Sequence, residues 1–152
     1  FVSADVFGTI MRSEEDAAAV GQEYEDMAEQ LDYICPMIYP SHYGPGNFGI
    51  EYPDTQPYDT ILNALNGSRE LLAASAKEDA PQAVVRPWLQ DFTASYLEHY
   101  IKYGDEQVRQ QIQAVYDAGY DQWILWDAGV SYHYGGLLTP EEAAKEDERI
   151  AR

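Results

Sequence analysis

Ionisable side chains interrupt or follow four short apolar segments of this sequence, and they are the residues that could do chemistry. Asp5 lies inside the apolar run at the start of the chain, where an unpaired carboxylate is costly. We therefore expect Asp5 to face a polar cavity, where it could transfer a proton, or to be held by hydrogen bonds. In the second case it would bind a backbone amide or a neighbouring cation such as Arg86.

The densest polar cluster comes in the third apolar segment. Arg86, Trp88 and Gln90 have the same parity along a strand, so they should line one face of it. A buried arginine needs an anion, and we expect Asp5 or Asp127 to supply it from a neighbouring strand.

Aromatic and polar residues also follow the second apolar segment, where two prolines fix the exit of the chain. Tyr39 and Tyr43 suit a sugar platform, because an aromatic face packs on the C–H face of a pyranose while the hydroxyl bonds to its rim. His42 could shuttle a proton or donate a hydrogen bond, and a loop histidine more often binds than catalyses. Trp126 and Asp127 close the fourth segment in a similar way.

Strand and helix patterns alternate along the chain. The four apolar segments read as buried strands at residues 1–8, 33–43, 83–92 and 122–127. Helical periodicity follows each of these segments. Gly21 could break the first predicted helix in two, and Asn66 and Gly67 are a weak point in the second. The third runs from Asp105 to Gly119, and a Thr139 capping box opens the last.

Four strand–helix units predict parallel strands with right-handed crossovers, that is, an α/β fold. The 152 residues suit a single domain. Two architectures fit: a small open doubly wound parallel sheet, or the C-terminal half of a (β/α)8 TIM barrel, which needs about 250 residues when complete. We favour the half barrel because strand character begins at the first residue. The loop 40–56 is long enough to indicate a functional role.

Composition excludes several classes of function. A formal charge of −18 argues against nucleic-acid binding, and no apolar run approaches the length of a membrane helix, so we expect no membrane insertion. The single cysteine, Cys35, is expected to fill the core. His42, His99 and His133 are too far apart for a zinc motif, and we expect no metal or other cofactor.

Five segments resemble, in order and spacing, a glycosyl hydrolase domain family of bacterial proteins long filed as a domain of unknown function. They are residues 3–8, 20–22, 36–43, 86–92 and 123–127. The resemblance implies a TIM barrel related to carbohydrate-cleaving enzymes, with these segments forming strands five to eight. It also suggests an extracellular or cell-envelope location.

The resemblance implies a site at the C-terminal face of the barrel. Catalytic candidates are then Asp5, Asp91 and His42, and substrate-binding candidates are Tyr39, Tyr43, Arg86, Trp88, Gln90, Trp126 and Asp127. Relatives have an upstream Asp-Tyr-x-Arg-Phe-Pro motif that is absent here, and their last strand ends Trp-Asn where this chain has Trp126 and Asp127. Because glycoside hydrolysis needs two carboxyl groups, we expect the isolated chain to be inactive.

Two functions therefore stay open. The first is hydrolysis of a polysaccharide or oligosaccharide, with the missing N-terminal half of the barrel, or self-association through the open edge, completing the domain. The second is a carbohydrate-binding or cell-surface scaffold without turnover. A complete open-sheet domain that binds another ligand is a weaker third possibility. Only the scaffold would tolerate Asp5→Asn.

Overall fold

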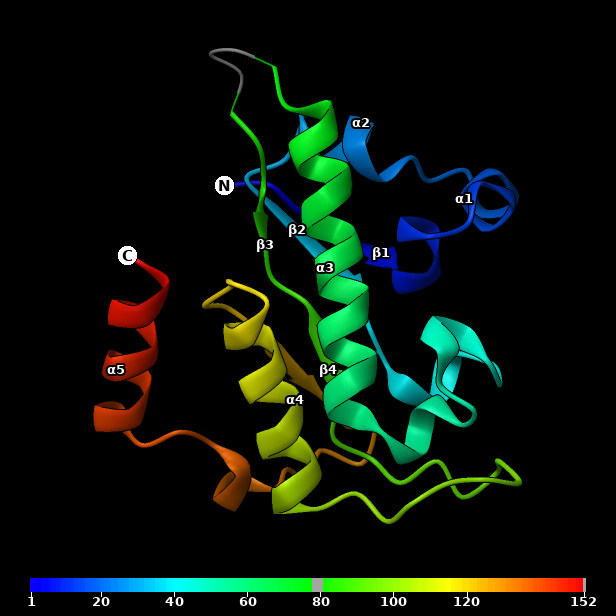
Figure 1. The fold of residues 1–152 in the computed structure, drawn as a ribbon, viewed down its shortest axis with the longest axis vertical. Helices are drawn as coiled ribbons and strands as arrows, with labels where there is room; N and C mark the ends of the chain where they lie inside the picture. Colours follow the sequence, from blue (N-terminus) through cyan, green and yellow to red (C-terminus); the bar gives the residue numbers. More distant parts are fainter. Residues whose placement is uncertain (78–80, 152) are drawn as a thin grey trace.

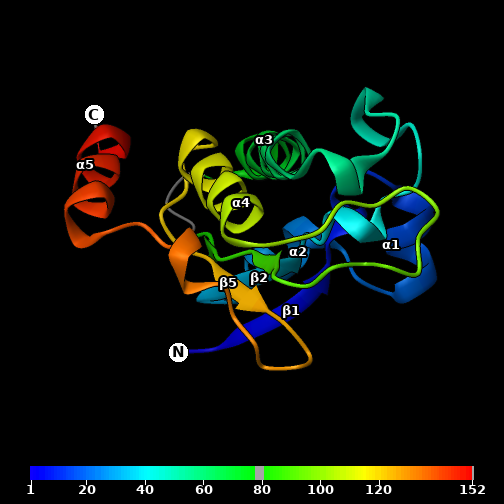
Figure 2. The ribbon, with the colours of Figure 1, turned by 90° about the horizontal axis from the view of Figure 1, so that it is seen from below.

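The computed structural model, which describes residues 1–77 and 81–151, contains one parallel sheet with its helices gathered on one side (Figures 1 and 2). The strands pair in the order β1-β2-β4-β5, and β3 also pairs with β2. All pairs are parallel. The strands are β1 (Ser3–Phe7), β2 (Tyr33–Met37), β3 (Val84–Val85), β4 (Trp88–Gln90) and β5 (Ile124–Trp126). The predicted α/β class is confirmed.

The third apolar segment forms two short strands, β3 and β4, rather than one continuous strand. The interruption falls at Arg86 and Pro87, where the proline has no N–H to donate to a ladder. The carbonyl of Pro87 still accepts the N–H of Ile124 at 2.9 Å, which joins β4 to β5. The chain therefore bends between β3 and β4 while both strands stay in the same sheet.

Helix boundaries follow the signals in the sequence. Gly21, with a φ of 67°, ends the first helix, and a second begins three residues later. The Thr139 and Glu142 capping box opens the last helix as predicted. The helices are α1 (Glu14–Val20), α2 (Tyr24–Ala28), α3 (Pro57–Ser75), α4 (Asp105–Asp117) and α5 (Pro140–Ile150).

The core lies between the sheet and the pair of helices α3 and α4. Figure 2 shows these two helices side by side above the sheet. Ile34 and Leu89 of the sheet are completely buried, as are Ile61 and Leu65 of α3 and Ile112 of α4. Burial of these side chains fixes which face of each strand points toward the helices.

No described helix covers the opposite face of the sheet (Figure 2). Apolar side chains on the strands are accordingly accessible there: Phe7 at the end of β1 is 49% exposed, and Trp126 at the end of β5 is 42% exposed. No described helix is long and apolar enough to cross a membrane.

The loops that leave the carboxyl ends of β2 and β4 are long and ordered. The first has three 3-10 turns, at Pro40–His42, Asn47–Gly49 and Pro53–Thr55, before α3 begins. The second loop runs from the end of β4 to α4. It lies beside the first loop, since Tyr103 donates its hydroxyl to the carbonyl of Asp54 at 3.1 Å. Both loops therefore lie at the edge where binding groups collect in parallel sheets.

Gly67 lies in the interior of α3, which runs through the predicted weak point without a break. A Cβ at this position would come no closer than 4.0 Å to the Cγ of Arg12. We expect Gly67→Ala to raise the free energy of unfolding by about 0.5–1 kcal/mol, because alanine loses less backbone entropy in a helix. Urea denaturation measures this, with Gly21→Ala as the opposite control, since its left-handed φ should make alanine destabilising.

Candidate active site

Asp5 stands on the open face of the sheet and is bound by a tryptophan from β4. Its Oδ1 accepts a hydrogen bond from the indole Nε1 of Trp88 at 2.8 Å. The ring of Trp88 in turn meets that of Trp126 edge to face, with centroids 5.9 Å apart. A carboxylate and two indoles from β1, β4 and β5 thus form one accessible group of side chains.

Tyr39 and His42 lie beside this group, on the chain that leaves β2. Tyr39 is buried, and burial together with the negative charge of Asp5 raises the pKa of its phenol to about 12. The ring of His42 packs edge to face on Tyr39 at 5.0 Å, and partial burial lowers the pKa of its imidazole. This shift favours the neutral imidazole, which can both accept and donate a hydrogen bond.

Within the described part of the chain Arg86 pairs with no carboxylate, so the expected contact with Asp5 or Asp127 is wrong. Its guanidinium donates to Oε1 of Gln122 from Nε at 2.9 Å and from Nη2 at 2.6 Å, and it lies 4.0 Å from the centre of the Tyr33 ring. The break at Pro87 separates Arg86 from β4. Stacking and an amide acceptor therefore satisfy this cation near the amino ends of the strands.

Gln90 is completely buried, at the centre of a polar network rather than in an open site. Its Oε1 accepts the N–H of Ser41 at 3.0 Å, and its Nε2 donates to Oδ1 of Asp54 at 2.9 Å and to the carbonyl of Phe92 at 3.0 Å. Burial raises the pKa of Asp54, although these hydrogen bonds partly oppose the shift. The network joins the two long loops to the end of β4.

Asp91, the next residue, binds a histidine that the sequence did not single out as a site residue. Its side chain is 0% exposed, and its Oδ1 lies 2.6 Å from Nδ1 of His133 while its Oδ2 accepts the His133 N–H at 2.9 Å. The imidazole itself is 40% exposed. The group that this pair presents to solvent is therefore the histidine, with Asp91 orienting it.

Tyr43 and Asp127 have structural contacts. The Tyr43 ring is 6% exposed and packs against Phe48 at 5.0 Å, and its hydroxyl has no hydrogen-bond partner among the described residues. Asp127 accepts the Ser131 N–H at 2.8 Å and so stabilises the turn after β5. Tyr43 therefore belongs to the core, and Asp127 to the turn that follows Trp126.

Residues 1–132, from β1 through the loop after β5, match the model of the family described as a putative glycosyl hydrolase domain. The chain belongs to this family. The resemblance seen in the five motifs is therefore confirmed, and the glycosyl hydrolase family makes a carbohydrate-related function the expected one. Comparisons with curated proteins and with solved structures give no match.

For this glycosyl hydrolase family member, the structure brings together part of the predicted site: Asp5, Trp88, Trp126, Tyr39 and His42. His133 and Asp54 are additions that no spacing in the sequence indicates, because each meets its partner only through folding, 42 residues from Asp91 and 36 from Gln90. Among the described residues, no group of three or more His, Cys, Asp or Glu side chains could hold a metal ion.

Proposed function

We propose that this chain forms the carboxyl-terminal half of a glycoside hydrolase barrel that binds and cleaves a polysaccharide or oligosaccharide. The observation that supports this best is the accessible carboxylate of Asp5, bound by Trp88 and flanked by the exposed Trp126. Aromatic faces bind sugar rings, and a carboxyl group supplies acid, base or nucleophile. Membership of the glycosyl hydrolase family favours the same combination.

In this proposal Asp5 is one of the two catalytic carboxyl groups. Trp88 fixes its orientation, and His42 and His133 are two further accessible ionisable groups near the strand ends. Trp126 forms the stacking surface. Tyr39 is buried near Asp5 and Tyr43 is buried against Phe48, so neither offers the sugar an open ring face.

The uncovered face of the sheet supports the half-barrel part of the proposal. In a closed barrel this face turns inward and is covered by the side chains of other strands. Phe7, Val84 and Trp126 would then lie inside the barrel or at its mouth. The second carboxyl group would come from one of the additional strands, so the chain by itself would be inactive.

The test is release of reducing ends from a panel of polysaccharides, by this chain and by a version extended upstream of Phe1. We expect activity only in the extended protein. Asp5→Asn should lower it about 100-fold or more, as expected for loss of an acid–base group. Asp121→Asn, at an exposed position after α4, is the matched control and should keep full activity.

The alternative function is a carbohydrate-binding scaffold without turnover. The chain's own geometry gives it some support, since Asp5 already accepts a hydrogen bond from Trp88 and could orient the indole for stacking. No reducing ends from any substrate, combined with glycan binding that survives Asp5→Asn and is lost in Trp126→Ala, would favour the scaffold over the hydrolase.

A further inference from the structure

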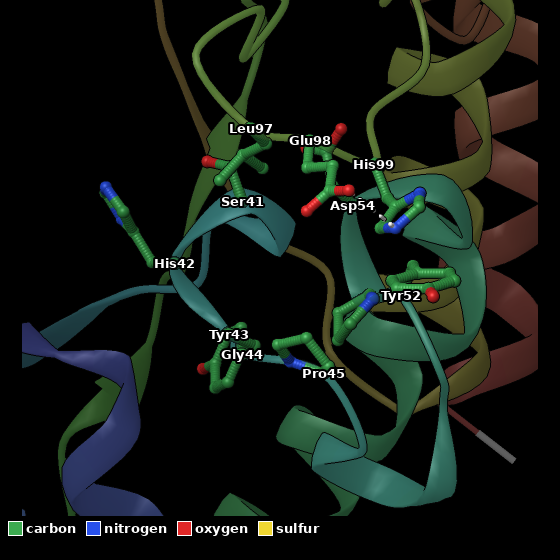
Figure 3. Close-up of a pocket in the computed structure, with 11 residues that line it drawn as sticks. Ser41, His42, Tyr43, Gly44, Pro45, Tyr52, Asp54, Leu97, Glu98 and His99 are labelled. Atoms are coloured by element: carbon green, nitrogen blue, oxygen red, sulfur yellow. Dashed lines mark ion pairs between the residues drawn. The ribbon is translucent and has the colours of Figure 1, made fainter.

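A cavity of about 320 Å³ opens between the two long loops, and His42, which lies beside the group around Asp5, is among its lining residues (Figure 3). Tyr52 and Asp54 line it from the loop after β2, and Leu97, Glu98 and His99 line it from the loop after β4. Its size lies at the small end of ligand pockets. The hydrogen bond from Gln90 to Asp54 connects its wall to the end of β4, so the cavity belongs to the same edge of the sheet.

Carboxylates are the only charged groups of fixed sign on the described walls of this cavity. Glu98 is 91% exposed, and its nearest ionic neighbour is His99 at 4.0 Å. The negative charges of Glu51 and, to a smaller extent, Glu98 raise the pKa of the Tyr52 phenol. No lysine or arginine is among the lining residues, and the whole chain has a formal charge of −18. An anionic ligand is therefore disfavoured.

The wall between the acidic groups is aromatic. The rings of Tyr52 and His99 stack with centroids 3.8 Å apart and an angle of 34° (Figure 3). Such a stack packs against the C–H groups of a ring ligand, and the Tyr52 face also attracts a cation. Ser41, 92% buried, lines the cavity as well, and its hydroxyl has no hydrogen-bond partner among the described residues.

We propose that this cavity is a subsite for a sugar residue with a free amino group, a hexosamine that is not acetylated. The sugar ring lies against Tyr52 and His99, and its ammonium group faces the Glu98 carboxylate. This inference rests on the proposed function, because it names a substrate class for the same strand-end edge. A neutral sugar would gain nothing from the exposed Glu98 carboxylate, and an acidic sugar would be repelled by it.

The test is direct binding, measured by NMR titration of the chain with a β-1,4-linked glucosamine tetramer and with its fully N-acetylated counterpart, at about pH 6, where the amine is protonated. We expect the amino tetramer to bind more tightly and to shift amides in residues 41–54 and 97–99. Glu98→Gln should weaken its binding about threefold to fivefold, as expected for an exposed ion pair. It should leave the acetylated tetramer unaffected.

Glu70→Gln on the exposed surface of α3 is the matched control, because it removes the same charge away from the cavity. Equal binding of the two tetramers, an equal loss in Glu70→Gln, or no binding of either tetramer would overturn the inference. Reducing-end release without an amino preference would leave the proposed hydrolase intact while removing this subsite. Amino-sugar binding without hydrolysis by any version of the protein would support the subsite and contradict the proposed hydrolase.

Discussion

Gln90→Ala is expected to lower the free energy of unfolding by about 3–5 kcal/mol. The substitution leaves the Ser41 N–H and one Asp54 oxygen without their partner, and each unsatisfied buried group costs about 1–3 kcal/mol. The side chain is completely buried, so a cavity adds to the loss. Urea denaturation followed by circular dichroism measures the change. The backbone clamp from Gln111 stays in place, because it binds the N–H and carbonyl of Gln90.

Two further variants make the Gln90 prediction specific. Gln110→Ala, on the outer side of α4, should change stability by less than about 0.5 kcal/mol. Gln90→Glu replaces the donor to Asp54 with a second carboxyl group, so one of the two must hold a proton and the folded-state pKa rises above the unfolded value. Stability is then present at low pH and lost as pH rises through the folded pKa. Equal losses at about pH 5 and pH 8 would contradict this account.

Gly8→Ala is expected to cost about 2–3 kcal/mol, at the upper end of the overpacking range. A Cβ at this position would lie 2.5 Å from the carbonyl oxygen of Met37 and 2.6 Å from the hydroxyl of Tyr43. The first of these is backbone of the neighbouring strand and cannot rotate away. Thermal denaturation should show a lower midpoint, with Gly44→Ala as a control near zero, since its nearest neighbour is Asn47 Nδ2 at 3.8 Å.

A double substitution separates the two contacts of Gly8. Tyr43→Phe alone should be neutral or slightly stabilising, because it removes a buried hydroxyl that has no described partner. Combined with Gly8→Ala it relieves the side-chain contact and leaves the one with the Met37 carbonyl. We therefore expect partial rescue. Full rescue would contradict this account, because it would mean that the Met37 carbonyl can move away from the added methyl group although Met37 is paired in the β1–β2 ladder.

The sequence by itself determined the alternation of strands and helices and several helix ends, whereas the observed strands are shorter than predicted and the third segment forms two of them. Local signals were enough where the physics is local: Gly21 ends α1 with a left-handed φ, and the Thr139 capping box opens α5. Period-two and 3.6-residue patterns gave the α/β class. The motifs around Asp5, Trp88 and Trp126 gave the family.

Only the tertiary structure decided which polar groups satisfy one another. Arg86 donates to Gln122 and stacks on Tyr33 instead of binding Asp5 or Asp127. Asp91 binds His133, which lies on a loop 42 residues away in the sequence. Hydrogen bonds between distant segments depend on the register of the strands and on the paths of long loops, and neither leaves a periodic trace in the sequence. Burial of Gln90 and exposure of Asp5 were settled in the same way, because which strand face the helices cover is a property of the packed chain.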